Sequence, residues 1–566
     1  MFECLNVGMF ECWNVERRDM KKDRLLVVLA GVALCLKTVA ATYTVPAGDV
    51  TTLTNLLKTV GDWNSIKLSK GVYDLSVLTN APMYRGWVGA SLLTCPVGTT
   101  ITGETGNPDD VVLKGGGRYR ILVVPGGCTV KNLTFADGNA NDPSHSSYDY
   151  GGAMSTTGGT TPECRNCIFT NNLARRYGGA VAGVNCTDCR FYDNQVTGNS
   201  GYGGAGHLGK YTRCVFSGNT AIGDAYGCGG ALNQATLVSD CTAVSNLASH
   251  KGGALYQCKN IVDSRFRYNA AATTASVNPR GGAISDCGPI TNCVVEYNLA
   301  SSYAHGICNG SAVGSTFRFN GNAHHGVDGS LVGRFEKCTF VGSSVRDAEL
   351  YDCHVHSVSS RIHVSGNVYF GDTTANNTYA FIDVAVMRNS LVSDVWLTNA
   401  VNNALFCSNG GQPMLVENCT IADNVYQHML RYYNITNNSA TFVNTAIVRN
   451  RTHNRAAIRD LSGYEARYVS LTNCIMGVTN LVQHSSCGFV DCKVLGENWN
   501  PAFIGDGDHP YSTKARSRLC SAGRILDWMT EDATDLAGNP RVRDGKVDVG
   551  CYQCWLEPVG MSIKVK

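Results

Sequence analysis

Cysteines are the residues of this chain that could do chemistry most directly, because there are 26 of them in 566 residues. Two Cys-x-x-Cys pairs, Cys164 with Cys167 and Cys186 with Cys189, are spaced as in a zinc site. On one extended strand, residues three apart point to opposite faces, which opposes a shared metal. The separation of the pairs also matches one period of an internal repeat. We therefore expect buried thiols that act as small apolar side chains, with zinc as the alternative.

The segment that begins at Asp137 could hold calcium. Asp137, Asn139 and Asn141 offer alternating oxygen ligands in a turn that contains glycine, as the first positions of a calcium loop do. The later positions differ, since Asp142 replaces the expected glycine and Tyr148 stands where a bidentate glutamate would close the site. The alternative is a surface loop rich in Asn and Asp. We predict no cofactor, with calcium as a possible exception.

A column of residues that each precede a glycine pair could bind sugars. Its members are Tyr150, Tyr177, Tyr202, Cys228, Lys251, Arg280 and, by a weaker match, His305. If they stack along one corner of a repeat structure, tyrosines give way to cations along its length. Aromatic rings suit the faces of sugars and cations suit carboxylates, so the column predicts a binding site for an extended acidic glycan. The alternative is that these corner positions accept any soluble residue.

No group of side chains predicts catalysis. Acid–base cleavage of a glycosidic bond requires carboxylates that converge on the bond. The chain offers His207, His305, His324 and His325, which stand apart from any recognisable carboxylate set, and we expect each at a surface or turn position. Catalytic residues are therefore unknown from the sequence, although a folded chain can bring distant residues together.

A repeat must position all of these residues. The triplet Gly-Gly-Ala recurs every 23 to 29 residues, and between its copies runs the pattern Cys-x-Phe-x-x-Asn. The triplets begin at Gly151, Gly178, Gly203, Gly229, Gly252 and Gly281. The clearest copies of the second pattern are Cys167-Phe169-Asn172, Cys189-Phe191-Asn194 and Cys214-Phe216-Asn219. A recurrence with this period is typical of a solenoid.

The pattern also predicts the local structure of each unit. Its Cys and Phe lie two residues apart and therefore face the core from one strand. The Asn falls where that strand ends, and it suits a turn because Asn tolerates the left-handed region. The glycine pair marks a corner that needs a positive φ or a close backbone approach. About 25 residues per unit leave room for two or three short strands and none for a crossover helix.

The two patterns together resemble the repeat of the polymorphic outer-membrane adhesins. The layout from about Leu122 to Leu495 resembles the pectin-lyase-like superfamily, whose members include lyases, hydrolases, adhesins and inert scaffolds. Residues 70–75, 100–104 and 130–135 are similar to the first coils of secreted β-helix proteins. The resemblance implies an all-β fold, a single-stranded right-handed parallel β-helix (solenoid) with N- and C-terminal caps.

The C-terminal part carries a further resemblance. Residues 535–541 and 547–552 are similar to the terminal motif of bacterial surface proteins that are grouped as choice-of-anchor domains. The usual Ala-Tyr-Glu ending is replaced by Cys551-Tyr552-Gln553. Cys551 and Cys554 form another Cys-x-x-Cys pair, which in an exported protein is a candidate for a disulfide or a redox site.

The N-terminal residues 1–41 predict export. Basic residues at 21–24 precede an apolar stretch at 25–36, and small residues follow at 39–41, which is the layout of a secretory signal. The stretch is too short to span a bilayer comfortably. We expect translation to begin at Met20. The predicted location is secreted or cell surface, with no transmembrane segment after signal cleavage.

The sequence thus divides into four parts. These are a signal region (1–41), an N-terminal cap with the first coils (42–120), β-helix repeats (121–500) and a C-terminal cap or anchor-like segment (501–566). The net charge of +2 argues against a nucleic-acid partner. We predict an adhesin or polysaccharide-binding module whose partner is a polysaccharide or a cell-surface glycan. The alternative is a polysaccharide lyase or glycoside hydrolase on the same fold, so enzymatic activity stays open, and a passive structural rod is the third candidate.

Overall fold

The structure is a computed structural model that describes most of residues 41–554. The gaps are 80–82, 85–88, 142–148, 159–160, 224–225, 273–277, 303, 321–326, 342, 344, 357–379, 396–403, 409–412, 427, 433–438, 453–460, 465–467, 481–486, 497–498, 502, 506–508 and 516. The predicted signal region and the histidines His324 and His325 lie outside the described residues.

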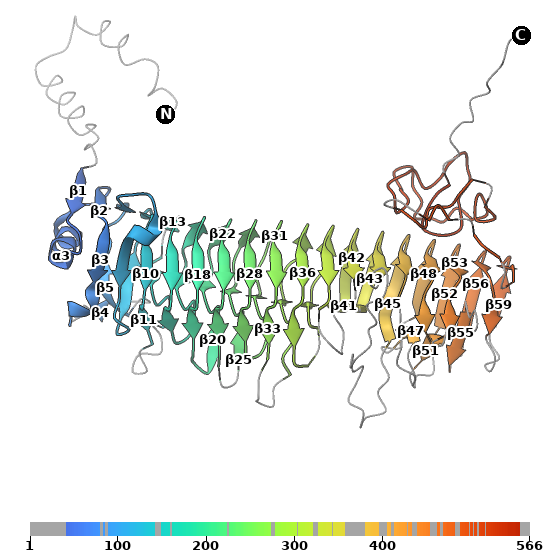
Figure 1. Cartoon of the computed structure of the whole chain (residues 1–566), viewed down its shortest axis with the longest axis horizontal. Coiled ribbons are helices and arrows are strands. Elements are labelled where there is room, and N and C mark those ends of the chain that lie inside the picture. Colours follow the sequence, from blue (N-terminus) through green and yellow to red (C-terminus); the bar gives the residue numbers. More distant parts are fainter. Residues whose placement is uncertain are drawn as a thin grey trace, which may run out of the picture.

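The chain winds into a parallel β-helix, seen from the side in Figure 1. One turn is represented by β16 (Val181–Ala182), β17 (Asn185–Thr187), β18 (Arg190–Tyr192) and β19 (Gln195–Val196). Each of these strands pairs in parallel with the strand at the same position of the next turn, and we number the resulting sheets 1 to 4 in that order. The predicted fold class, an all-β right-handed parallel β-helix, is confirmed.

The strands of each sheet recur once per turn. Sheet 1 continues through β8 (Arg120–Val124), β12 (Met154–Thr156), β21 (Gly206–His207), β26 (Leu232–Asn233), β30 (Leu255–Tyr256), β34 (Ile284–Ser285) and β38 (Ile307–Cys308). Sheet 2 includes β13 (Glu163–Arg165), β22 (Lys210–Thr212), β27 (Leu237–Ser239), β41 (Val327–Glu336), β43 (Val345–Tyr351), β45 (Ala380–Arg388) and β48 (Met414–Glu417). Sheet 3 includes β10 (Thr134–Ala136), β14 (Ile168–Thr170), β23 (Val215–Ser217), β46 (Leu391–Ser393), β49 (Thr420–Ala422), β53 (Ala446–Val448) and β57 (Ile475–Met476). Sheet 4 includes β11 (Asn139–Ala140), β15 (Leu173–Ala174) and β24 (Thr220–Ala221).

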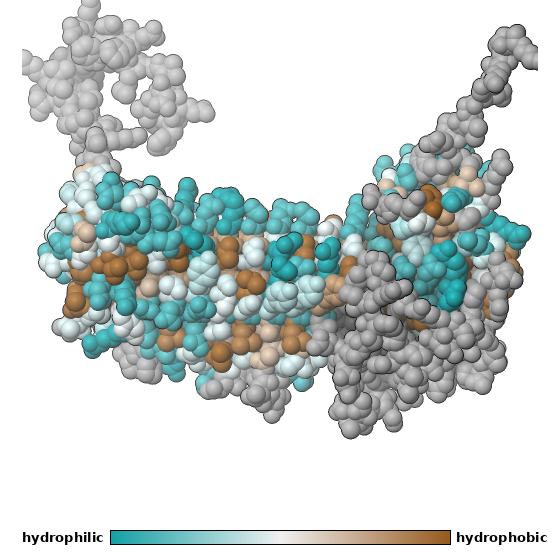
Figure 2. All heavy atoms as spheres, viewed as in Figure 1, coloured by the Kyte–Doolittle hydropathy of each residue, from teal (hydrophilic) through white to brown (hydrophobic). Residues whose placement is uncertain are grey.

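Phenylalanines of the repeat form a continuous stack inside the solenoid. The rings of Phe169 and Phe191 lie 4.9 Å apart, as do those of Phe191 and Phe216, and all three side chains are fully buried. The cysteine two residues before each Phe is buried as well, as predicted. Because one side chain recurs at the same place in each turn, residues of like hydropathy also line up along the outside of the rod (Figure 2).

The expectation that Cys164 and Cys167 point to opposite faces is wrong. Both are buried in the core, because Asn166 between them adopts a left-handed conformation with φ 48° and turns the chain from sheet 2 to sheet 3. Cys186 and Cys189 flank Asp188, whose φ of 56° makes the same corner.

The cysteine before each Phe has a hydrogen-bonding role in addition to its packing. The Sγ atom of Cys241 lies 3.4 Å from the backbone nitrogen of Cys214, and its thiol reaches the carbonyl oxygen of Ser239 at 3.2 Å. In the next turn Ser264 takes this position, and its Oγ accepts from the backbone nitrogen of Cys241 at 3.0 Å. A short side chain that both donates and accepts is therefore required there, which explains why Cys and Ser replace each other.

The asparagine of the repeat builds a buried ladder and not a turn. The Oδ1 atom of Asn194 accepts from the backbone nitrogen of Asn172 at 3.1 Å and from its side-chain nitrogen at 2.9 Å. The side-chain nitrogen of Asn194 donates in turn to Asn219 and to the carbonyl oxygen of Phe169. The left-handed position that we assigned to the asparagine belongs to the residue before it, such as Asp193 with φ 52°. The correction has a physical reason, since a buried amide must satisfy all its donors and acceptors inside the solenoid.

Both reasons given for the glycine pair are correct, one for each glycine. Gly178 has φ 61°, which disfavours other residues. A Cβ on Gly179 would lie 2.1 Å from the carbonyl oxygen of Gly204 and 2.6 Å from that of Gln195. The second glycine therefore lets neighbouring turns approach each other, and the pair fixes the register of the residue before it.

The two ends of the solenoid differ. At the N-terminal end the helix α3 (Val50–Thr59) is capped by the side chain of Asp49 and buries Leu53 and Leu57 against the core. At the other end, residues 499–554 fold back beside the last turns (Figure 1). There Tyr552 packs in a cluster with Leu391 and Ala446, on the outer side of sheet 3. The C-terminal segment thus covers a side of the rod.

Within the described ranges, no helix has the length and apolar content that crossing a membrane requires.

Candidate functional site

The residues before the glycine pairs form one continuous column on the solenoid. Parallel bridges join Tyr150 to Tyr177 and Tyr177 to Tyr202, and others join Cys228 to Lys251 and Lys251 to Arg280. Between them, Tyr202 pairs with Cys228 through β20 (Ser200–Tyr202) and β25 (Tyr226–Cys228). We call the run from Tyr150 to Arg280 the corner column. The sequence predicted its geometry correctly, while its binding role stays a prediction.

The tyrosines of the corner column stack on one another. The rings of Tyr150 and Tyr177 lie 4.8 Å apart with planes 13° apart, and those of Tyr177 and Tyr202 lie 5.4 Å apart with planes 16° apart. Arg176 places its guanidinium carbon 5.5 Å from the centre of the Tyr177 ring. Because neighbouring rings occupy both faces of Tyr177, a sugar cannot stack on it. The half-buried tyrosines instead offer ring edges and hydroxyl groups, one per turn.

A second row, on sheet 1, lies beside the column and was not found from the sequence. His207 on β21 is buried against Tyr177, with ring centres 4.6 Å apart, and its Nδ1 lies 2.8 Å from Oδ1 of Asn233 on β26. Tyr256 on β30 stacks near Tyr202, with ring centres 6.2 Å apart. Burial lowers the pKa of His207 to about 4, although its bond to Asn233 acts in the opposite direction. His207 is therefore a neutral, buried residue, and the expected surface or turn position is wrong.

The basic end of the corner column is partly neutralised. Lys251 makes an ion pair with Asp286, with Nζ and Oδ2 3.0 Å apart, and lies 5.8 Å from the ring centre of Tyr256. Asn309 also donates to Asp286. The sequence could have revealed Asp286, because it comes directly after Ser285 of sheet 1, at the corner of the turn that follows the turn of Lys251. The column thus ends in a mixed-charge group that includes the half-buried Arg280.

His305 does not belong to the corner column. Gly282 donates its backbone N–H to Ala304, so His305 takes the place of the second glycine of its turn. Its side chain is 4% exposed, and its Nδ1 lies 2.9 Å from the backbone nitrogen of Ala300. The weaker sequence match was therefore out of register, and the surface position expected for this histidine is also wrong.

The residues of the predicted calcium loop are split between a corner and a strand. Asp137 adopts φ 56° and accepts from the side-chain nitrogen of Asn171 at 2.6 Å. Asn139 lies on β11, where its Oδ1 accepts from the backbone nitrogen of Asn141 at 2.7 Å. Asp137 and Asn139 line an open hollow of about 510 Å³ that Lys114 also lines. The Oδ1 atom of each accepts from a protein donor, and Lys114 lies at the same hollow. The surface-loop alternative therefore accounts for these contacts, and calcium stays a prediction.

Two groups of cysteines lie close together. The side-chain ligand atoms of Cys164, Cys186 and Cys189 lie within 4.8 Å of one another, all buried. At the C-terminal end, Cys554 lies within the same distance of Cys520. These geometries keep zinc open as an alternative for the first group and give Cys554 a partner that the sequence did not suggest.

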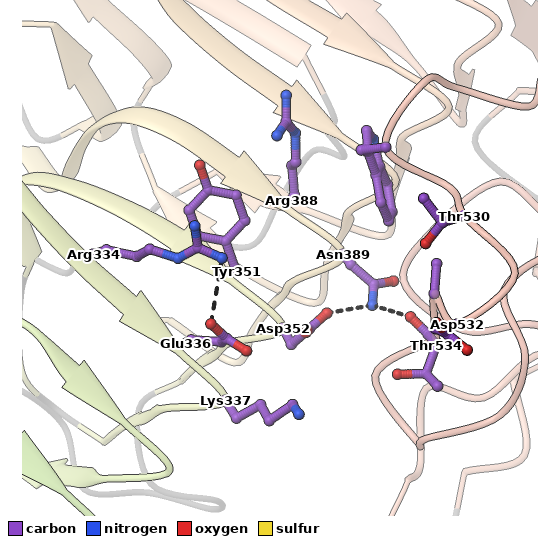
Figure 3. Close-up of a pocket in the computed structure, with 12 residues that line it drawn as sticks. Arg334, Glu336, Lys337, Tyr351, Asp352, Arg388, Asn389, Thr530, Asp532 and Thr534 are labelled. Carbon is purple, nitrogen blue, oxygen red and sulfur yellow. Dashed lines mark hydrogen bonds and ion pairs between the residues drawn. The ribbon is translucent and has the colours of Figure 1, made fainter.

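A separate pocket of about 450 Å³ lies where the C-terminal segment meets sheet 2 (Figure 3). On the solenoid side it is lined by the corner residues Lys337, Asp352 and Asn389, which follow β41, β43 and β45 in successive turns. All three have positive φ, of 53°, 52° and 47°. The facing wall is formed by residues 528–534.

Charged side chains surround this pocket. Arg334 lies over the ring of Tyr351 at 4.2 Å and pairs with Glu336 at 3.3 Å. Asp352 accepts from Asn389 at 2.6 Å, and burial raises the pKa of its carboxyl group. The sequence did not reveal this group, because its walls come from segments that are about 140 to 200 residues apart and carry no shared motif.

Comparisons with known proteins show similarity of fold. No protein family matches the chain, and no curated protein does either. Among solved structures, the catalytic unit of an alpha-1,3-glucanase from Streptomyces thermodiastaticus is 12% identical, with a TM-score of 0.26 over 82% of this chain and 69% of that one. The alginate lyase AlyGC is 8% identical, with a TM-score of 0.28 over 80% and 76% of the two chains. The pectate lyase Pel9A is 10% identical, with a TM-score of 0.23 over 91% and 96%. At these values the similarity says nothing of the site residues.

Proposed function

We propose that this protein is a secreted or cell-surface β-helix protein that binds an extended acidic polysaccharide or cell-surface glycan along the corner column. The observation that carries the proposal is the unbroken bridging of the column from Tyr150 to Arg280. A polymer laid along the rod meets a side chain of the column at each turn except that of Cys228, which is buried. Such a surface suits a repeating ligand better than a small molecule.

Recognition in this proposal depends on hydroxyl groups and cations and not on ring stacking. The hydroxyl groups of Tyr150, Tyr177 and Tyr202 donate and accept hydrogen bonds at one per turn, which matches the hydroxyl-rich edge of a glycan. Lys251 and Arg280 attract carboxylates further along the chain of sugars. Asp286 lowers the net charge there, so we expect moderate affinity that falls with added salt.

The test is retention on immobilised acidic and neutral polysaccharides, with and without calcium. Replacing Lys251→Ala and Arg280→Ala together should weaken retention of acidic polymers several-fold. The matched control removes the same charge elsewhere, with Lys210→Ala and Lys259→Ala, two exposed positions outside the column. If both double variants lost retention equally, a specific role for the column would be contradicted. If retention required calcium, the predicted calcium site at Asp137 would be supported.

The second candidate function is a polysaccharide lyase or glycoside hydrolase. The observation that favours it is the pocket that Asp352 lines together with Lys337, Arg334 and Tyr351. The pKa of the Asp352 carboxyl group is raised, and carboxyl groups with a perturbed pKa among basic residues are common in active sites. New reducing ends, or absorbance from unsaturated sugars, would identify cleavage in the same polysaccharide panel. Cleavage that Asp352→Asn abolishes would replace binding as the main function.

A further inference from the structure

The pocket beneath the C-terminal segment contains two buried polar atoms that lack partners. The Oδ1 atom of Asn389 and the Nε1 atom of Trp528 have no hydrogen-bond partner within the described part of the chain. Asn389 is 1% exposed, and both residues line the pocket. Buried polar atoms are rarely left in this state, so a missing partner is expected at each.

The orientation of the Asn389 amide is determined by its surroundings. Its nitrogen donates to Oδ1 of Asp352 at 2.6 Å and to the carbonyl oxygen of Thr534 at 2.8 Å, as the dashed lines in Figure 3 show. When Asp352 is ionised, both partners are acceptors and cannot donate. If the amide were turned by about 180°, its oxygen would face these two acceptors and both bonds would be lost. Among the described residues, the Asn389 oxygen is therefore a buried acceptor without a partner, and the Trp528 N–H is a buried donor without one.

We infer that this pocket binds a single sugar residue through its hydroxyl groups. A sugar hydroxyl both donates and accepts, so adjacent hydroxyls can satisfy the Asn389 oxygen and the Trp528 N–H together. The lining adds hydroxyl groups from Thr530 and Thr534 and an indole surface, a combination that suits a polar ring with apolar faces. A volume of about 450 Å³ exceeds what one water molecule needs and lies in the range of small-ligand pockets.

The charges of the pocket favour a neutral sugar over a highly charged anion. The lining contains the cations Arg334, Lys337 and Arg388 and the acids Glu336, Asp352 and Asp532. Two of the cations are already paired, Arg334 with Glu336 and Arg388 with Glu417. The groups that remain are one cation, Lys337, and two acids, Asp352 and Asp532, so the pocket has no excess of positive charge for an anion and hydroxyl recognition dominates.

This site is independent of the polymer binding proposed above. The corner column belongs to turns that hold residues 150 to 280, whereas the pocket belongs to turns that hold residues 334 to 389 and also needs residues 528–534. A terminal sugar or a branch of one sugar suits the pocket, because its facing wall is formed by a folded segment and its volume is that of a small-ligand pocket.

The experiment measures saturation-transfer NMR and calorimetric binding of the full chain with the methyl glycosides of glucose, galactose, mannose and N-acetylglucosamine. We expect at least one of them to bind. Trp528→Phe keeps an aromatic ring and removes the N–H, so it should weaken that binding by about tenfold. The matched control is Trp499→Phe, since Trp499 packs against the cluster that holds the C-terminal segment in place and does not line the pocket.

The outcomes separate the two sites. Absence of binding by all four glycosides, or equal binding by Trp528→Phe and the unmodified chain, would overturn the inference. If Trp528→Phe lowers the melting temperature by several degrees, the binding measurement is repeated with Thr530→Val, a substitution at the exposed rim of the pocket. We expect this variant also to bind the glycoside more weakly. The variant with Lys251→Ala and Arg280→Ala should lose polymer retention and keep glycoside binding, so failure of one proposal leaves the other intact.

Discussion

The ring of Tyr150 lies 4.8 Å from the ring of Tyr177 in the next turn of the solenoid, with the two planes only 13° apart. This distance equals the usual spacing of neighbouring strands, so the stack follows directly from placing one tyrosine at the same corner in each turn. The stack stabilises the corner and at the same time covers the ring faces. Ligand recognition and corner packing are thus carried by different atoms of the same side chain.

The hydroxyl groups of the corner column can be separated from its rings by substitution. Tyr177→Phe keeps the stack and removes one hydroxyl, so the melting temperature should stay within about one degree while polymer retention falls about threefold. Tyr177→Ala removes the hydroxyl and the ring, and the lost stacking with two neighbouring tyrosines should lower the free energy of unfolding by about 2 kcal/mol. Retention is measured on the polysaccharide that binds best. Unchanged retention by Tyr177→Phe would show that the hydroxyl does not contact ligand.

His207 should make stability depend on pH between about 4 and 6.5. Its pKa is about 4 in the folded chain, whereas an exposed histidine in the unfolded chain has a pKa of 6.5. The unfolded chain therefore takes up the proton first as the pH falls. The neutral histidine therefore contributes fully above about pH 6.5, and about 3 kcal/mol is lost as the pH falls toward 4.

Denaturant unfolding at pH 7.5 and pH 4.5 measures this contribution. His207→Gln keeps a polar side chain beside Asn233 and does not titrate, so its stability should fall less over the same interval. A parallel fall in both proteins would assign the pH dependence to other groups.

The asparagine ladder should dominate the stability of the central turns. Asn194→Ala removes the acceptor for two nitrogens of Asn172 and the donor for the carbonyl oxygen of Phe169, all of them buried. We expect the free energy of unfolding to fall by about 3 to 5 kcal/mol. The exposed Asn278→Ala is the matched control, with an effect within about 0.5 kcal/mol. Chemical denaturation followed by circular dichroism gives both values.

The sequence was sufficient to predict the solenoid and to place most of the corner column. Gly178, Gly179 and the residue before them recur together, so the corner column could be placed without a structure. The prediction for His305 failed because Ala304 and His305 occupy the two glycine positions of their turn, and Gly306, on which the match was based, occupies the position of the alanine. The Asp193–Asn194 pair shows a subtler failure, since either residue type tolerates a turn and only burial decides which one takes it.

The pocket beneath the C-terminal segment could not be predicted for a different reason. Asn389 and Trp528 line one pocket only because residues 499–554 fold back on the solenoid, and no periodicity connects them. The apolar residues that hold this segment, such as Leu519 and Val549, carry no signal that says which side of the rod they cover. Tertiary contacts of this kind depend on shape and not on a local pattern.

Cys520 and Cys554 should form a disulfide in an oxidising compartment. Their sulfur atoms lie within 4.8 Å of each other, whereas Cys551, the partner suggested by the sequence, is fully buried beside Thr420. In thiol–disulfide exchange, oxidised glutathione accepts two electrons and two protons and becomes two molecules of reduced glutathione, while the two cysteine thiols become one disulfide. The loop closed by this bond should stabilise the C-terminal segment by about 4 kcal/mol in the chain-entropy description.

Peptide mass spectrometry without reductant identifies the bond. We expect linked peptides that contain Cys520 and Cys554, and a lower melting temperature after reduction or in Cys520→Ser. A peptide with Cys551 joined to Cys554 would contradict the geometry, as would full reactivity of Cys554 with a thiol reagent after oxidation.

The second glycine of each pair should tolerate no side chain. A Cβ on Gly179 would lie 2.1 Å from the carbonyl oxygen of Gly204 and 2.6 Å from both the backbone nitrogen and the carbonyl oxygen of Gln195. The clash is with the backbone of two segments, so no side-chain rearrangement relieves it. We expect Gly179→Ala to reduce the free energy of unfolding by about 4 kcal/mol or more and to separate neighbouring turns. Gly288→Ala is the control, because its nearest neighbour would be 3.7 Å away and its effect should stay within about 0.5 kcal/mol. Since Gly179 also holds Tyr177 in register, Gly179→Ala should weaken polymer retention at temperatures where the chain stays folded, and normal retention there would show that ligand binding does not depend on the corner column.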